Sequence, residues 1–138
     1  MSVVRLALAF VVVVVAAACG PLHYQIQSSE LATGADADIY ADVKNDQGVT
    51  LLEIKATNLA QPARIKDGTA NFVAWSRKDK EATWARVAAL KYDEGARTGE
   101  LLGVSVANTS FDLQITVEVN ADAEAPSDGV LFAQRVGS

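Results

Sequence analysis

Polar and apolar residues alternate with a period of two along much of the chain. Over residues 36–44 the odd positions are apolar and the even positions polar or amphipathic, which predicts a half-buried strand. Residues 45–48 have the composition of a compact turn that ends in a glycine able to adopt a positive φ. The alternation resumes over residues 52–57, so these two segments are predicted to form an antiparallel hairpin.

Five further segments predict strands, and no segment predicts a helix. They are residues 71–75, 83–92, 98–106, 110–119 and 129–136. The first of them is apolar on both faces, which is typical of a central strand. Seven short strands in ~100 residues predict an all-β fold, a seven-stranded antiparallel immunoglobulin-like sandwich over residues 36–138. A closed barrel is the main alternative.

Trp75 lies on the third predicted strand, where its position resembles that of the core tryptophan of immunoglobulin domains. We therefore expect it between the two sheets. The sequence contains one cysteine, so the disulfide that usually lies beside this tryptophan cannot form within the domain. Packing alone is expected to hold the sheets together.

The first 18 residues differ from the rest of the chain. One basic residue, Arg5, precedes an apolar stretch over residues 6–18 that contains no polar side chain. As a helix this stretch would be about 20 Å long, shorter than the ~30 Å hydrocarbon core of a bilayer. With no charged flank after it, residues 1–18 are predicted to be a signal peptide rather than a membrane-spanning helix.

Residues 16–20, with the sequence Ala-Ala-Ala-Cys-Gly, resemble the lipobox of bacterial lipoproteins. The resemblance implies cleavage before Cys19, a diacylglyceryl group on its sulfur with palmitate-like chains, and acylation of the new amino terminus. Ala16 stands where leucine is commoner, and the alternative is an ordinary A-x-A cleavage site that leaves Cys19 as a free thiol. Gly20 resembles the second mature residue of lipoproteins exported to an outer membrane. The expected location is the cell envelope, lipid-anchored, at the periplasmic or surface face of the outer membrane.

Residues 20–35 show no sustained periodicity and are rich in glycine, proline and serine. Lipidated Cys19 and a flexible tether are therefore expected over residues 19–35. The single histidine, His23, falls in this segment, where Glu30 is the nearest acidic residue along the chain. We expect His23 to be solvated and to have no chemical role.

Charge excludes one class of partner. The sequence contains 12 basic and 17 acidic residues, and only Arg5 lies in the predicted signal peptide, so the remainder has a net charge near −6. No basic face for nucleic acid can be assembled from these residues. The length of 138 residues also excludes a multidomain enzyme.

Five short segments occur in an order that resembles exported bacterial β-sandwich domains of uncharacterised function, and loosely the extracytoplasmic domain of anti-sigma-K-type factors. They are Phe72–Trp75, Gly99–Leu101, Phe111–Glu118, Pro126–Ser127 and Val130–Leu131. The chain contains no cytosolic sigma-binding segment, so the resemblance does not carry an anti-sigma role. It implies no functional residues.

The residue patterns of common active sites are missing from the sequence. A Ser–His–Asp triad needs a histidine on the scaffold, whereas His23 lies in the predicted tether. Zinc needs three or four cysteine or histidine ligands, and the chain has one of each. The acidic pair at residues 93–94 lies in a predicted turn. We therefore expect no enzyme activity, no cofactor and no metal.

Asp36, Asp38 and Asp42 share one face of the first predicted strand. Calcium binds such carboxylates, but it requires six to eight oxygen ligands, usually on a bent loop. The favoured interpretation is a charged edge strand that discourages association between sheets.

A charged turn at residues 77–81, followed by a tryptophan, is the candidate contact site for a partner. Arginine and tryptophan are typical anchor residues of interfaces. The candidate residues are Arg77, Lys78, Lys80 and Trp84. The alternative is a solvated hairpin tip of mixed charge.

Two functions are consistent with these observations. The first is a lipid-anchored, non-catalytic cell-envelope domain that binds a protein or glycan partner. The second is a structural or assembly component of an envelope complex. In both, the expected contacts are with the membrane through the anchor and with an envelope protein or glycan, and not with nucleic acid.

Overall fold

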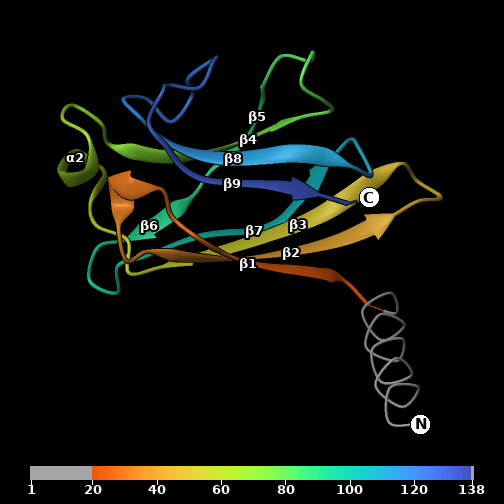
Figure 1. The fold of residues 1–138 in the computed structure, drawn as a ribbon, viewed down its shortest axis with the longest axis horizontal. Coiled ribbons are helices and arrows are strands. Elements are labelled where there is room, and N and C mark those ends of the chain that lie inside the picture. The colour runs from red at the N-terminus through yellow and green to blue at the C-terminus, as the bar shows by residue number, and fades with distance from the viewer. Residues whose placement is uncertain (1–19, 138) are drawn as a thin grey trace, which may run out of the picture.

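The computed structural model describes residues 20–137, which fold into two antiparallel β-sheets that face each other (Figure 1). The predicted signal peptide and Cys19 lie outside the described residues. Within these residues no helix is long and apolar enough to span a membrane.

The two sheets contain nine strands between residues 20 and 137. The five-stranded sheet has the order β1 (Leu22–Gln27), β2 (Asp36–Lys44), β3 (Val49–Thr57), β7 (Thr98–Val106) and β6 (Lys91–Asp93). The four-stranded sheet has the order β5 (Ala85–Ala89), β4 (Asn71–Arg77), β8 (Phe111–Glu118) and β9 (Val130–Val136). Two short helical segments, η1 (Glu30–Ala32) and α2 (Pro62–Ile65), lie in the connections.

The all-β prediction is confirmed, and so is the first hairpin. Strands β2 and β3 pair in register from Asp36 opposite Thr57 to Lys44 opposite Val49. Gly48 ends the turn between them with a φ of 68°, a conformation that glycine adopts without steric cost. Because the strands form two separate sheets, the closed-barrel alternative is wrong.

The predicted number of seven strands is wrong, partly because residues 83–92 are not one strand. Strand β5 belongs to the four-stranded sheet and β6 to the five-stranded sheet. Between them the backbone N–H of Leu90 donates to the carbonyl oxygen of Phe72 at 2.8 Å. The chain thus crosses from one sheet to the other at the end of the apolar run of residues 87–90, where no turn residue marks the change of sheet.

The flexible tether predicted over residues 19–35 is wrong for most of its length. Strand β1 pairs with β2 from Leu22 opposite Ala41 to Gln27 opposite Asp36. The physical reason is a short alternation, because Leu22, Tyr24 and Ile26 pack against the core while the residues between them face outward. The first strand therefore begins three residues after Cys19 in the sequence.

The segment that follows β1 is also held to the sandwich. The backbone N–H of Ser29 donates to the carbonyl oxygen of Leu131 at 2.7 Å, and its hydroxyl donates to that of Val130 at the same distance. Ala32 and Ala35 are buried. These contacts connect the start of the domain to β9, its last strand.

The core lies between the sheets and is built from inward-facing side chains of both. The five-stranded sheet contributes side chains such as Ile39, Leu52 and Ile54, and the four-stranded sheet contributes Phe72, Phe111, Leu113, Ile115, Val117 and Phe132. All of these are at most 2 % exposed.

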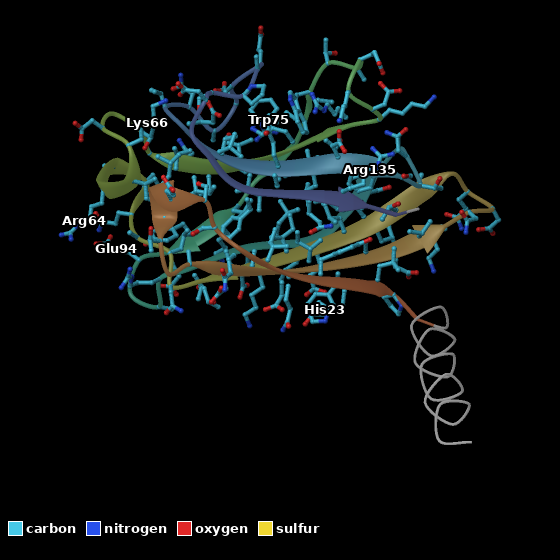
Figure 2. The ribbon with its side chains drawn as sticks, in the orientation of Figure 1. His23, Arg64, Lys66, Trp75, Glu94 and Arg135 are labelled. Carbon is cyan, nitrogen blue, oxygen red and sulfur yellow. The ribbon has the colours of Figure 1, made fainter. Side chains whose placement is uncertain are left out.

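Trp75 is fully buried but does not lie between the sheets, so the expected core position is wrong. Its neighbours Phe72 and Ala74 belong to the inter-sheet cluster, whereas Trp75 does not. Because successive side chains of a strand point to opposite faces, Trp75 lies on the outer face of the four-stranded sheet (Figure 2). Its indole Nε1–H donates to the hydroxyl oxygen of Thr116 at 2.8 Å.

The connection between β8 and β9 is bonded to this outer face. The Thr116 hydroxyl donates in turn to the carboxylate of Glu118, which is 5 % exposed and also accepts the backbone N–H of Ser127 at 2.8 Å. On the β5 side, Arg86 Nε donates to the carbonyl oxygen of Ala121 at 2.7 Å. The predicted central strand is therefore confirmed as buried on both faces, since Val73 and Trp75 lie on one and Phe72 and Ala74 on the other.

We predict that Trp75→Ala lowers the free energy of unfolding by about 3–5 kcal/mol, since the substitution leaves a large cavity and removes the donor to Thr116. Trp75→Phe should cost less, because the hydrogen bond is lost while most of the apolar volume stays. Chemical unfolding of both variants measures the difference.

Trp84→Ala is the matched control, because Trp84 is only partly buried. A midpoint of unfolding for Trp75→Ala equal to that of the unsubstituted protein would contradict the burial of Trp75.

Candidate functional site

The four residues predicted to contact a partner lie on one hairpin between β4 and β5. Arg77 ends β4, Lys78 and Lys80 are in the exposed tip, and Trp84 directly precedes β5. The guanidinium carbon of Arg77 is 4.3 Å from the centroid of the Trp84 ring, which is a cation–π contact. The structure thus brings Arg77 and Trp84 together and leaves the two lysines exposed around them.

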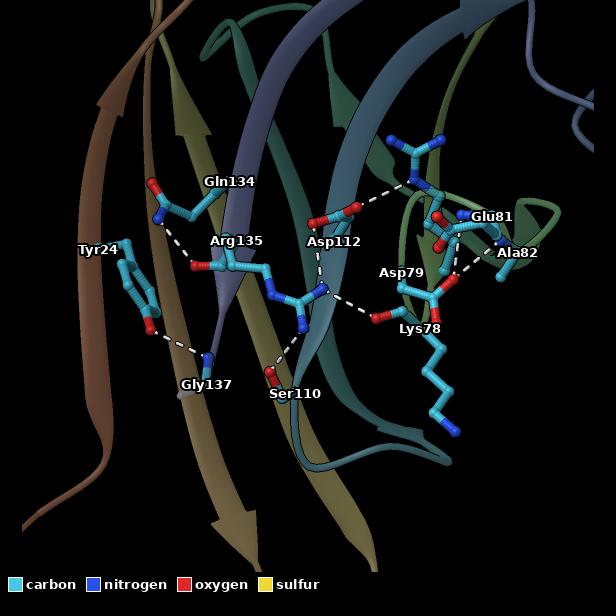
Figure 3. Close-up of polar contacts among 11 residues, drawn as sticks. Tyr24, Lys78, Asp79, Glu81, Ala82, Ser110, Asp112, Gln134, Arg135 and Gly137 are labelled. Atoms are coloured by element: carbon cyan, nitrogen blue, oxygen red, sulfur yellow. Dashed lines mark hydrogen bonds and ion pairs between the residues drawn. The ribbon is translucent and has the colours of Figure 1, made fainter.

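A row of alternating charges supports the base of this hairpin (Figure 3). Arg77 on β4 is opposite Asp112 on β8, which is opposite Arg135 on β9. Arg77 Nε donates to Asp112 Oδ2 at 3.0 Å, and Arg135 Nη1 donates to Asp112 Oδ1 at 3.2 Å. Opposite charges on directly paired strand positions stabilise a sheet.

Arg135 also connects the hairpin to neighbouring segments. Its Nη1 donates to the carbonyl oxygen of Lys78 at 2.9 Å, and its Nη2 donates to the hydroxyl of Ser110 at 2.9 Å. Neither Asp112 nor Arg135 was predicted from the sequence to be a site residue. Only the pairing of β8 with its two neighbours brings these side chains to Arg77, and no spacing along the chain reveals that pairing.

The tip of the hairpin is closed by Asp79. Its Oδ1 accepts the backbone N–H groups of Glu81 and Ala82, each at 3.0 Å, in the manner of an Asx turn. We call Lys78, Lys80, Trp84 and Arg135 the hairpin patch. With Arg77, the patch and its supports contain four basic side chains against Asp79, Glu81 and Asp112, a local excess of +1 on a chain of formal charge −5.

The pKa of the Asp112 carboxyl group is lowered by the two arginines beside it. Partial burial raises its pKa, but the hydrogen bonds and positive charges of Arg77 and Arg135 outweigh burial and bring the pKa below its ordinary value of 3.8. Asp112 thus stays ionised, and holds both arginines, under mildly acidic conditions.

His23 lies on strand β1, so its placement in a tether is wrong, although its side chain is 39 % exposed. On the outer face of the five-stranded sheet its Nε2 lies 2.9 Å from Asp38 Oδ1. Its ring stacks on Tyr40, with centroids 4.3 Å apart and an interplanar angle of 9°. The hydrogen bond from His23 is the main cause that lowers the pKa of Asp38.

The aspartates of β2 do not gather into a metal site. Asp38 bonds to His23, and Asp42 lies 3.0 Å from the ammonium nitrogen of Lys44. Across residues 20–137, no group of three or more histidine, cysteine, aspartate or glutamate side chains is placed to hold a metal ion. The interpretation of these aspartates as a charged edge is wrong for Asp36 and Asp38, because β1 pairs with β2 from Asp36 to Ala41, whereas Asp42 lies one residue beyond this pairing.

No protein-family model, curated protein or solved structure matches this chain with significant similarity. A functional assignment therefore depends on the sequence and on the geometry described above.

We predict that Asp112→Asn lowers the free energy of unfolding by about 1–2 kcal/mol at neutral pH, because two arginines lose their ionised acceptor in a partly exposed site. The pKa of Asp112 is lowered in the folded state, so its stabilisation is present above pH ~3.8 and is lost as the pH falls through the folded-state pKa. The difference in the free energy of unfolding between Asp112→Asn and the unsubstituted protein should therefore shrink below pH ~3.8.

Asp128→Asn is the control for this experiment. Asp128 also pairs with a basic residue, Lys66, but its side chain is 92 % exposed, so this substitution should change stability little. A difference for Asp112→Asn that stays constant from pH 7 to pH 2.5 would contradict the role given to the carboxylate.

Proposed function

We propose that this protein is a lipid-anchored, non-catalytic domain of the cell envelope that binds a protein or glycan partner through the hairpin patch. The observation that carries the proposal is the fixed stack of Arg77 on Trp84. Tryptophan and arginine supply most of the binding energy in many interfaces, and a side chain that is already rigid loses little entropy on binding.

The parts of the patch have different roles in this proposal. Arg77 is a positioning residue, because Asp112 occupies its Nε and its side chain is only 26 % exposed. Trp84 provides the apolar contact. Lys78, Lys80 and Arg135 provide the exposed positive charge, so the proposed partner presents carboxylate or other acidic groups.

The anchor in this proposal is the lipid on Cys19, at the outer membrane. The support is the match of residues 16–20 to a lipobox, after an apolar stretch of signal-peptide length. Two or three acyl chains on one residue hold a domain firmly to a membrane, whereas a single chain binds only marginally. No cofactor and no nucleic acid enter the proposal.

We further propose that the sandwich is of the immunoglobulin type. The order β2-β3-β7-β6 corresponds to the A-B-E-D sheet of immunoglobulin domains, and β5-β4-β8-β9 corresponds to C′-C-F-G. In this correspondence β1 is an added strand beside A. The main departure is Trp75, which is on the strand that corresponds to C but on its outer face.

Cys19→Ser is expected to abolish lipid attachment, because the hydroxyl group cannot take the place of the thiol that accepts the diacylglyceryl group. Incorporation of labelled palmitate and fractionation of envelopes measure the effect. The idea of an anchor fails if the parent incorporates no label and the variant fractionates as the parent does.

Reversal of the charges in the patch, by Lys78→Glu combined with Lys80→Glu, is expected to reduce capture of a partner crosslinked in intact envelopes by about tenfold. The matched control is Arg64→Glu combined with Lys91→Glu, which changes the net charge equally at two other exposed positions. Thermal unfolding of both variants verifies that they are folded.

Equal capture by both double variants would eliminate the hairpin patch as the binding site. If the purified protein instead forms stable multimers that survive both reversals, the alternative role in assembly is favoured.

A further inference from the structure

Three large apolar side chains are exposed on the outer face of the five-stranded sheet. Tyr40, Leu51 and Leu102 are 40 %, 43 % and 61 % exposed. Tyr40 on β2 is directly opposite Glu53 on β3, and Leu51 is two residues from Glu53 and so shares its face. Pro21, Tyr40 and Leu51 line a shallow hollow of about 190 Å³. We call Pro21, Tyr40, Leu51 and Leu102 the sheet patch.

A β-bulge contributes Leu102 to the sheet patch. Leu52 is opposite Val104 and Ile54 is opposite Leu101, so two residues of β7, Leu102 and Gly103, face the single residue Glu53. Gly103 has a φ of 68°, which glycine tolerates. The bulge lets Leu101 and Val104 pack inward while Leu102 points to solvent.

The sheet patch lies beside the start of the folded chain. Cys19 is three residues before Leu22, so even a fully extended chain keeps the two Cα atoms within about 11 Å of each other. Leu22 begins β1, and the next residue, His23, is directly opposite Tyr40. A lipid attached to Cys19 would therefore enter the bilayer next to the sheet patch.

With such an anchor, the sheet patch needs to contribute only a small free energy to orient the domain on the membrane. Because the protein is already held at the membrane, contact between the patch and the lipid is an intramolecular event at high effective concentration. Leucine side chains partition into the apolar region, and tyrosine favours the boundary between lipid and water. A tenfold preference for one orientation corresponds to only ~1.4 kcal/mol.

The charges on this face favour a zwitterionic lipid surface. Three of its carboxylates have basic partners: Asp38 with His23, Asp42 with Lys44 at 3.0 Å, and Glu100 with Lys55 at 3.9 Å. Asp36 and Glu53 add further negative charge, so the acidic groups outnumber the basic ones. An anionic lipid surface would be repelled.

We propose that the sheet patch rests on the zwitterionic phospholipid surface into which the lipid of Cys19 inserts, so that the five-stranded sheet faces the membrane. This inference rests on the lipid anchor proposed above. The hairpin patch belongs to the four-stranded sheet, on the other side of the sandwich (Figure 1). The orientation therefore presents the hairpin patch away from the membrane, toward a partner.

The test uses the lipidated full chain in phosphatidylcholine vesicles that contain nitroxide-labelled lipid. A thiol-reactive fluorophore is placed at Leu102→Cys, or in the control at Val119→Cys, because both positions are 61 % exposed and Val119 directly follows β8 of the other sheet. The sulfur of lipidated Cys19 is a thioether and does not react. We expect the lipid to quench the label at residue 102 at least about threefold more than at residue 119.

A second matched pair of labelled positions tests whether the quenching at residue 102 is caused only by the local backbone of the β-bulge. Leu51→Cys lies in the sheet patch and Leu31→Cys lies in η1, with exposed fractions of 43 % and 46 %. The same difference in quenching is expected between these positions.

The outcomes separate this inference from the anchor on which it rests. Mass spectrometry and flotation with vesicles report the anchor, and a protein that is not acylated overturns both proposals. An acylated, vesicle-bound protein with equal quenching within each pair overturns the orientation alone. Crosslinking of one copy to another through residue 102, without quenching by lipid, would assign the face to a second copy and also overturn it.

Discussion

The fold depends on the burial of β4 and β8, the two central strands of the four-stranded sheet, on both of their faces. Strands β4 and β8 pack their inner side chains, such as Phe72 and Ile115, against the five-stranded sheet, and their outer side carries the buried Trp75 and Thr116. A buried indole N–H, a hydroxyl and a carboxylate require partners, and Trp75, Thr116 and Glu118 supply them to one another in sequence. With one cysteine in the sequence, no disulfide within the chain can join the two sheets, and the packing of the inter-sheet core holds them together.

The same double burial positions the residues at the base of the hairpin patch. Because β4 and β8 are fixed on both faces, Arg77 and Asp112 are presented in register at the ends of their strands, and Arg135 on β9 completes the row. The Trp84 ring is held by a guanidinium that is itself held by a carboxylate. In the proposed function, these contacts position Trp84 and Arg135 before binding, which would lower the entropic cost of association.

The short distance between Cys19 and β1 links the proposed anchor to the orientation of the domain. A long tether would allow the sandwich to rotate freely above a membrane, whereas Gly20 and Pro21 alone allow little separation. The two sheets then face different surroundings. In the proposed orientation, the sheet patch faces the lipid surface and the hairpin patch faces the partner, because the two patches lie on different sheets of the sandwich.

The alternation of polar and apolar residues determined the strands, because a half-buried strand requires that alternation wherever it lies: β2, β3, β7, β8 and β9 were all predicted. The same pattern was too short to identify β1. It also could not reveal that residues 83–92 cross between sheets, since residues 87–90 are all apolar and no turn residue separates β5 from β6. Arg77 and Trp84 were found from their residue types, whereas Asp112 and Arg135 join them only through the pairing of β4, β8 and β9.

The tertiary structure decided which face of a sheet each side chain occupies, because alternation along the sequence does not indicate which face packs against the other sheet. Trp75 belongs to a predicted strand that is apolar on both faces, and it lies outside the inter-sheet core because the β8–β9 connection, which no periodicity predicts, covers the outer face of the sheet.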